Sequence, residues 1–211
     1  MKKLFLLLVL LVSTAGMAQK TKAKPAAKAT PKNVVLATSD NVSAEIISEK
    51  SGKRLVLFVK SEGKIDTLEV KNLEKSDFKP TTITLKNFTT QGKKFYHLNW
   101  TEEIKIDTKI KKENGVVVED QLWDTETKTL LIGNSYKSSH IKETVFLDAN
   151  KTASHDVEKN RNEGFEFTLN ADGSFNLKTK TQNSTYVYNT ATSKYEIKSA
   201  PKTAPATKKK K

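Results

Sequence analysis

Apolar and polar residues alternate with a period of two through most of the chain between residues 33 and 198. The clearest example spans residues 104–111, where isoleucine or threonine occupies the even positions and lysine or aspartate the odd ones. Side chains that alternate in this way lie on opposite faces of a β-strand. The same pattern recurs in residues 165–169 and 175–177, whereas residues 54–59 are more uniformly apolar, as in a central strand. The pattern predicts a predominantly β protein.

Polar turns separate the apolar segments. Asn170–Gly173 predicts a hairpin turn, with Gly173 free to adopt a left-handed conformation. Further turns are expected at Ser51-Gly52, Glu62-Gly63 and Asn114-Gly115. Helical turns are expected only at residues 73–77 and 155–160. Other strands are predicted at 34–38, 44–47, 65–70, 82–85, 95–100, 116–123, 130–132, 144–147, 185–188 and 195–197. We therefore predict an all-β fold, a single antiparallel β-sandwich or barrel-like domain of about a dozen short strands.

One internal similarity links residues 122–132 to residues 187–197, which align without gaps and share three identical residues, Thr125, Thr127 and Ile132, with their counterparts. Each segment has the pattern of a strand, a polar turn and a return strand. A β-propeller would need at least four copies at a regular spacing. Two copies favour a hairpin whose turn chemistry simply recurs over a propeller of few blades.

The two ends of the chain differ in composition from this core. Residues 1–18 carry Lys2 and Lys3, an apolar run of about nine residues and a small-residue ending, the pattern of a secretory signal peptide. Residues 19–32 and 199–211 are rich in Lys, Ala, Pro and Thr, which predicts disordered segments flanking a β domain at residues 33–198. The apolar run is too short for a transmembrane helix. We expect an exported bacterial protein, periplasmic or extracellular, with no membrane span.

The charge is concentrated in these terminal segments. The chain has 37 basic and 24 acidic residues and no cysteine. Twelve of the basic residues lie before Asn33 or after Lys198, and all the acidic residues lie between those two positions, so the β domain itself carries only +1. A near-neutral domain has no general attraction for phosphates, which argues against a specific nucleic-acid partner. The lysines at the C-terminus, Lys208, Lys209, Lys210 and Lys211, are candidates for contact with an anionic surface, or serve only to keep the protein soluble.

Catalytic and metal-binding patterns are weak. The three histidines, at 97, 140 and 155, have no spacing that converges on a metal, and we expect His97 to be packed or half-exposed. Asp148–Asp156 begins like a calcium loop but has Ala153 at the glycine position and Lys159 in place of the final glutamate, so a polar loop is the preferred interpretation. The pattern supports no enzymatic activity, metal or cofactor.

Aromatic side chains give the better functional lead. Trp100 shares a strand face with Tyr96 and Leu98, which predicts a core position. Trp123 shares its face with polar residues and is expected to be partly exposed, and Tyr136, Tyr186 and Tyr188 are further candidates for contact with a ligand. The alternative is that these rings form cross-strand pairs that stabilise hairpins.

Three functional hypotheses follow. The preferred one is a non-enzymatic, envelope-associated module that binds a glycan or a protein through Trp123 and the tyrosines. The alternatives are electrostatic association with an anionic surface through the basic ends, and a hydrolase whose site is assembled from distant strands.

Overall fold

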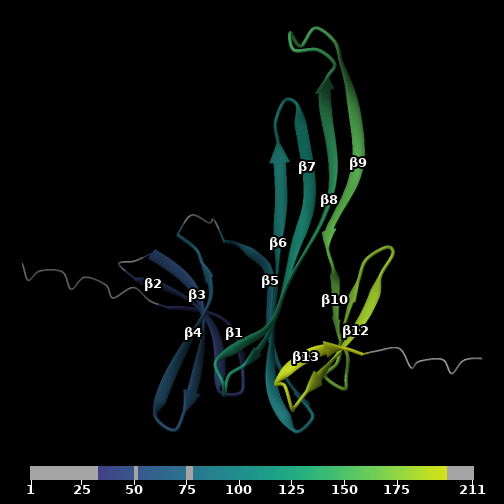
Figure 1. Ribbon diagram of the computed structural model, residues 1–211. Helices are drawn as coiled ribbons and strands as arrows, with labels where there is room; N and C mark the ends of the chain where they lie inside the picture. The colour runs from purple at the N-terminus through teal and green to yellow at the C-terminus, as the bar shows by residue number, and fades with distance from the viewer. Residues whose placement is uncertain (1–32, 50–51, 75–77, 199–211) are drawn as a thin grey trace, which may run out of the picture. The chain divides into compact units, whose positions relative to one another are not determined.

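Every regular element of the described chain is a β-strand. A computed structural model describes residues 33–49, 52–74 and 78–198, which form thirteen antiparallel strands in three sheets (Figure 1). This confirms the predicted all-β, antiparallel architecture. No helix in the described residues is long and apolar enough to cross a membrane. The predicted signal peptide, residues 1–18, and the two predicted disordered segments, residues 19–32 and 199–211, lie outside the described residues.

The N-terminal sheet contains four strands joined in sequence order. They are β1 (Val34–Ser39), β2 (Val42–Glu49), β3 (Gly52–Ser61) and β4 (Lys64–Asn72). The predicted turn at Glu62-Gly63 joins β3 to β4, and both of its residues have positive φ angles, 36° and 81°. Two successive positive φ values match the right-handed twist of the strands that the turn connects. The apolar run at residues 54–59 lies in β3, as expected, with Leu55, Val56 and Leu57 fully buried.

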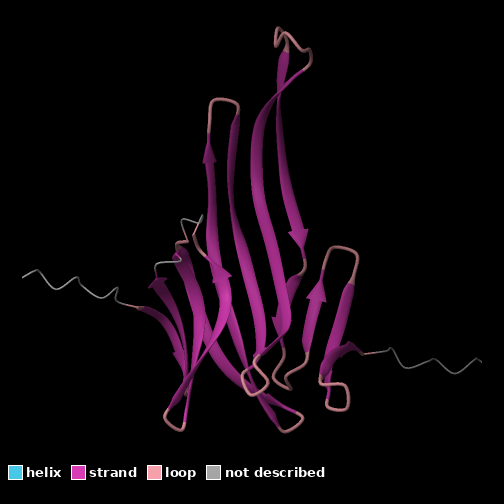
Figure 2. Ribbon diagram, turned by 60° about the vertical axis from the view of Figure 1, so that its left-hand side comes forward, coloured by secondary structure: helices cyan, strands magenta, loops and turns pink. Residues whose placement is uncertain are grey.

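The central sheet contains five strands, most of them longer than the pattern predicted. They are β5 (Pro80–Thr90), β6 (Lys93–Asp107), β7 (Lys111–Asp124), β8 (Thr129–Phe146) and β9 (Ser154–Gly164). The alternation at residues 104–111 belongs to β6, the turn that follows it and the first residue of β7. The distal halves of β6–β9 continue past the ends of the other two sheets (Figures 1 and 2).

The C-terminal sheet contains the four remaining strands. They are β10 (Glu166–Leu169), β11 (Phe175–Lys178), β12 (Asn183–Asn189) and β13 (Lys194–Ile197). The predicted hairpin turn at Asn170–Gly173 joins β10 to β11, and Gly173 has a φ of 79°. The Asp172 carboxylate closes this turn by accepting hydrogen bonds from the Ser174 amide at 2.9 Å and from its hydroxyl at 2.6 Å.

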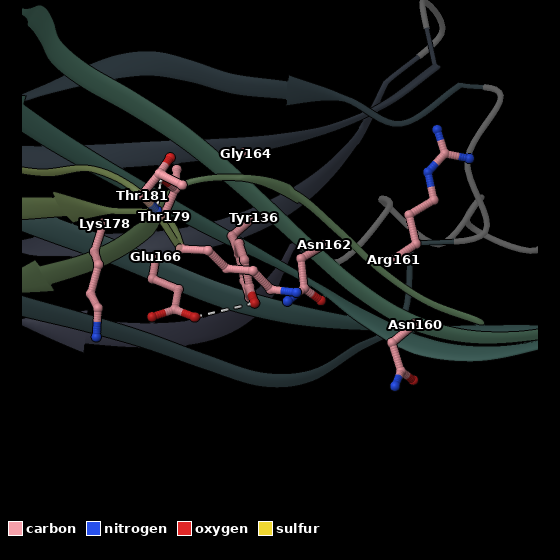
Figure 3. A pocket seen from close by; sticks show the side chains of 10 residues that line it. Tyr136, Asn160, Arg161, Asn162, Gly164, Glu166, Lys178, Thr179 and Thr181 are labelled. Atoms are coloured by element: carbon pink, nitrogen blue, oxygen red, sulfur yellow. Dashed lines mark hydrogen bonds between the residues drawn. The ribbon is translucent and has the colours of Figure 1, made fainter.

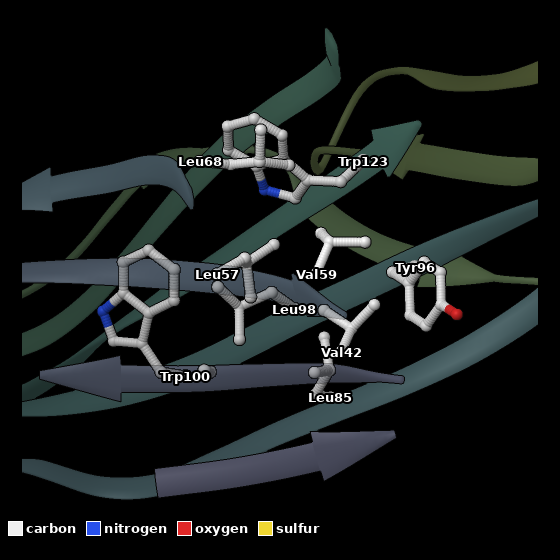
Figure 4. Close-up of a cluster of buried hydrophobic side chains, with 10 residues drawn as sticks. Val42, Leu57, Val59, Leu68, Leu85, Tyr96, Leu98, Trp100 and Trp123 are labelled. Carbon is white, nitrogen blue, oxygen red and sulfur yellow. The ribbon is translucent and has the colours of Figure 1, made fainter. Parts of the chain in front are cut away.

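The two smaller sheets pack on opposite faces of the central one. Even-numbered residues of β6, Tyr96, Leu98 and Trp100, join a buried cluster with the N-terminal sheet (Figure 4). Its other members are Val42, Ala44, Leu57, Val59, Leu68, Leu85 and Trp123. Odd-numbered residues of β6 face the C-terminal sheet, where the Phe95 ring lies 4.8 Å from Tyr188 and the His97 ring 5.2 Å from Phe167. Successive side chains of one strand thus serve two different cores.

Two local predictions are wrong. Asn114-Gly115 is not a turn but lies inside β7, paired with His140 and Ser139 of β8. Residues 155–160 are not helical but belong to β9, where they pair with the end of β8. In both places the cross-strand pairing of long strands overrides the local preference for a turn or a helix. Part of the helical turn expected at 73–77, like Ser51 of the Ser51-Gly52 turn, lies outside the described residues.

Candidate functional site

An open cavity of about 420 Å³ lies where the central sheet gives way to the C-terminal sheet (Figure 3). Its walls are formed by β8, by the end of β9, by the start of β10 and by the loop between β11 and β12. The volume falls within the range of roughly 300–1,000 Å³ that is typical of small-molecule sites. The lining residues are Tyr136, Asn160, Arg161, Asn162, Gly164, Glu166, Lys178, Thr179, Lys180 and Thr181.

Tyr136 occupies the centre of the lining. It is half-buried in β8 opposite Gly164, the last residue of β9, and its hydroxyl donates a hydrogen bond of 3.3 Å to Glu166 Oε1. Gly164 has a φ of 79°, and a Cβ at this position would lie 2.1 Å from the Ser135 carbonyl oxygen. Only glycine fits here, because the chain must pass close to β8 as it leaves the central sheet. Gly164 therefore permits the close approach of β9 to β8 beside Tyr136.

Two exposed asparagines, Asn160 and Asn162, extend the site along β9. Each has its side-chain oxygen engaged by the neighbouring strand: Ser138 Oγ donates to Asn162 Oδ1 at 3.0 Å, and His140 Nδ1 lies 2.9 Å from Asn160 Oδ1. In this arrangement the two side-chain NH₂ groups have no partner within the described chain. They are hydrogen-bond donors held in a fixed position and open to solvent.

The opposite wall carries positive charge and hydroxyl groups. Lys178 and Lys180 are exposed, and Thr179 Oγ1 accepts hydrogen bonds from the amides of Thr181 at 3.3 Å and Gln182 at 3.1 Å, which shapes the loop. Arg161 forms an ion pair with Glu163 and, by strand alternation, lies on the face of β9 opposite to Asn160 and Asn162. Glu166 is the one carboxylate in the lining.

The structure brings Tyr136 to this cavity but places Trp123 elsewhere. Trp123 is only 6% exposed and belongs to the core beneath the N-terminal sheet, where its indole N–H donates to Gln121 Oε1 at 2.9 Å. The predicted partial exposure of Trp123 is therefore wrong. Trp123 does share a strand face with Gln121, as the alternation predicts. That face is buried because the N-terminal sheet covers it.

Tyr186 and Tyr188 also lie away from the cavity lining. The Tyr186 ring stacks on Phe175 at 4.9 Å with an interplanar angle of 6°, and Tyr188 is 4% exposed between Phe95 and Tyr195. These rings form the aromatic core of the C-terminal sheet. Phe175 with Tyr186 and Tyr188 with Tyr195 are cross-strand pairs, the alternative to ligand contact given above. The pKa of Tyr195 is raised by burial, and its hydroxyl donates to the Gly173 carbonyl at 2.9 Å.

His97 is partly buried within the central sheet, in the range that its strand face predicted. The Nε2 of His97 lies 2.8 Å from Asp120 Oδ1, an atom that also accepts a 2.9 Å hydrogen bond from the side-chain NH₂ group of Asn99. The Asp148 loop is a closed polar loop, as preferred: the Asp148 carboxylate accepts hydrogen bonds from the amides of Thr152 and Ala153. The hydrogen bond from the Thr152 hydroxyl, at 2.8 Å, and then these amide hydrogen bonds lower the pKa of Asp148. No group of potential metal ligands occurs in the part of the chain that the structure describes.

Of the residues that line the cavity, the sequence predicted only Tyr136 as a site residue. Asn160 ends the helical turn that the pattern predicts at 155–160, and Glu166 and Lys178 come from a different sheet. The one available signal was the polar character of both faces of residues 154–164, which is typical of an exposed edge strand. The lysines at 208–211 lie outside the described residues.

No family model, curated protein or solved structure matches this chain.

Proposed function

We propose that this chain is an exported binding module of the bacterial envelope and that the cavity at Tyr136 holds a polar, hydroxyl-rich ligand, a glycan. The observation that carries the proposal is the pair of free amide donors of Asn160 and Asn162 beside a half-buried tyrosine. Glycans present hydroxyl groups that accept and donate hydrogen bonds, together with apolar C–H faces. A site for them needs fixed polar groups and a flat ring.

The charges of the lining favour binding over hydrolysis. Hydrolysis of a glycosidic bond by two carboxylates requires a pair on either side of the bond. Glu166 is the one carboxylate of the cavity, and it already accepts a hydrogen bond from Tyr136. Its role in the proposed complex is to orient the tyrosine hydroxyl and to accept hydrogen bonds from the ligand.

Calorimetric titration tests the proposal with soluble peptidoglycan fragments and with neutral oligosaccharides as probes. We expect Tyr136→Ala and Asn162→Ala each to weaken binding of the responding probe by about tenfold, the loss of one well-placed contact. Asn87→Ala is the matched control, because Asn87 is an exposed asparagine of β5 outside the cavity lining. The proposal fails if no probe binds, or if all three variants bind the responding probe equally well.

A further inference from the structure

A second surface, at the far end of the central sheet, exposes apolar side chains. Nine large hydrophobic residues of the described chain are exposed, and four of them lie at this end. They are Ile106 (37% exposed), Ile110 (52%), Val145 (36%) and Leu147 (67%), and we call them the distal tip. Scattered exposed hydrophobic residues are normal on a soluble protein, but a cluster at the end of a projection marks an interaction site.

Hydrogen bonds hold the two halves of the distal tip together. The β6–β7 turn carries Ile110, whose carbonyl accepts a 2.8 Å hydrogen bond from the Thr144 amide of β8. The β8–β9 loop begins with Leu147, whose amide donates to the Ala153 carbonyl at 2.9 Å. The Asp148 carboxylate closes the same loop through Thr152 and Ala153. The apolar side chains are therefore presented on ordered backbone.

Lysines surround the distal tip. Lys105, Lys109, Lys142 and Lys151 are exposed, and none forms an ion pair with another described residue. Four acidic residues lie nearby. Glu143 forms an ion pair with Lys159 at 2.5 Å, and Asp107 forms one with Lys112 at 3.8 Å. Asp148 is held within its loop, and Asp156 accepts a 2.8 Å hydrogen bond from the Thr144 hydroxyl. Lys151 extends across the ring of Phe146, with its Nζ 5.4 Å from the ring centroid. A long lysine side chain can keep its charge at a polar boundary while its methylene groups follow apolar surface.

We propose that the distal tip docks onto an anionic lipid bilayer, with Ile110 and Leu147 entering the acyl boundary and Lys109, Lys142 and Lys151 meeting lipid phosphates. Apolar residues beside unpaired lysines are the combination that binds such interfaces. A second copy of the chain is a poorer occupant. Its lysines would face these lysines, and four side chains bury far less than the roughly 1,000 Å² that a stable interface needs. This surface is separate from the cavity at Tyr136.

Vesicle flotation tests this docking with the processed chain. The probes are vesicles of phosphatidylcholine mixed with phosphatidylglycerol, and vesicles of phosphatidylcholine alone. We expect the wild type to float with the anionic vesicles and less so at high salt. The double variant Ile110→Ser, Leu147→Ser should bind the anionic vesicles at least about tenfold more weakly, because it lacks two apolar side chains that enter the bilayer interface. Ile65→Ser is the matched control, since Ile65 is 62% exposed on β4 and lies outside the distal tip.

A fluorescent variant keeps the proposal testable if the double variant folds poorly. Both native tryptophans are buried, Trp100 at 1% and Trp123 at 6% exposure. The fluorescence of Leu147→Trp should therefore shift to the blue and be quenched by brominated lipid when anionic vesicles are added.

Several results would overturn the docking. One is that the double variant floats as well as the wild type, and another is that Ile65→Ser loses as much binding as the double variant. A third is that flotation disappears when residues 199–211 are deleted from a chain whose distal tip is intact. A concentration-dependent dimer that the double variant abolishes, without vesicle binding by the wild type, would identify the tip as an interface between copies instead.

Discussion

Glu113 is an ionised group at a position where a β-sheet normally holds an apolar one. Its side chain is 2% exposed in β7, and its carboxylate oxygens lie 2.8 Å from Lys111 Nζ and 2.8 Å from Lys137 Nζ. The ammonium group of Lys111, then that of Lys137 and the nearby Ser139 hydroxyl, lower the pKa of Glu113 from its usual 4.5 to about 2. Lys111 lies on the same strand as Glu113, whereas Lys137 lies on β8. The ion pair between Lys137 and Glu113 therefore joins β7 to β8 and stabilises the distal part of the central sheet.

Acid should weaken the fold through Glu113. A carboxyl group whose folded-state pKa lies below its unfolded value stabilises the fold above the unfolded pKa and loses that contribution as the pH falls through the folded pKa. We expect Glu113→Gln to unfold at lower urea concentration than the wild type at pH 7, with the difference shrinking between about pH 4.5 and pH 2. Urea unfolding across this range measures it. Parallel stability curves for the two proteins would contradict the assignment.

The exposure of a side chain was predictable where strand alternation alone determines it. It was not predictable where it depends on which face of the sheet another sheet covers. Trp100 is 1% exposed and Tyr96 is 2% exposed, as their shared face predicted. Trp123 obeys the same alternation, yet its exposure depended on which face of β7 another sheet covers. That information lies in β2, β3 and β4, more than fifty residues earlier in the chain, and no local pattern carries it.

At the scale of the strand, Gly115 allows two long neighbours to approach closely. A Cβ at Gly115 would lie 2.3 Å from the Ser138 carbonyl oxygen and 2.6 Å from Ser139 Cβ, both on β8. Gly115 therefore marks a close backbone contact within the sheet, as an isolated glycine in a strand often does. Asn-Gly is also the strongest short hairpin signal, which is why the sequence predicted a turn at this point.

We expect Gly115→Ala to destabilise the protein by about 1–3 kcal/mol, because the new methyl group meets backbone and not a flexible side chain. Gly133→Ala is the matched control. Gly133 lies in β8, the neighbouring strand of the same sheet, but its Cβ would meet only Leu130 Cδ2, at an ordinary 3.6 Å. Chemical denaturation of both variants measures the difference. Equal stability of the two variants would show that β7 and β8 separate at no cost.

Element identity was predictable for hairpins with distinctive turns, and element length was not. The turn at Asn170–Gly173 and the turn at Glu62-Gly63 both occur where expected. β8 runs for 18 residues, although the pattern predicted two short strands at 130–132 and 144–147. The segment between them, residues 133–143, is mostly polar, with Tyr136 and Ile141 its only large apolar or aromatic residues, so it becomes a strand through pairing with β7 and β9 and not through its own periodicity. The cavity lies on this segment, and its lining could therefore not be assembled from the sequence.

At the scale of the whole described chain, β6 connects two cores. Leu98 is fully buried beneath the N-terminal sheet, whereas the neighbouring Phe95 is fully buried against Tyr188 of the C-terminal sheet. The C-terminal sheet has only short strands of 4–7 residues, and Phe175 holds it together through ring contacts with Phe167, Tyr186 and Tyr195. Small sheets of this kind are marginal alone and need a neighbouring layer to cover one face.

Sharing one strand between two cores should make unfolding a single cooperative event. We expect Phe175→Ala to cost about 3–5 kcal/mol, as for a fully buried aromatic side chain. If the layers unfold together, this variant loses hydrogen-exchange protection in β2 and β3 by the same amount as in β11 and β12, although the ring contacts of Phe175 lie within the C-terminal sheet. Leu98→Ala should have the reciprocal effect from the other core. Protection that persists in β2 and β3 while β11 and β12 exchange would show instead that the C-terminal sheet opens on its own, and with it the wall of the cavity that carries Lys178 and Thr179.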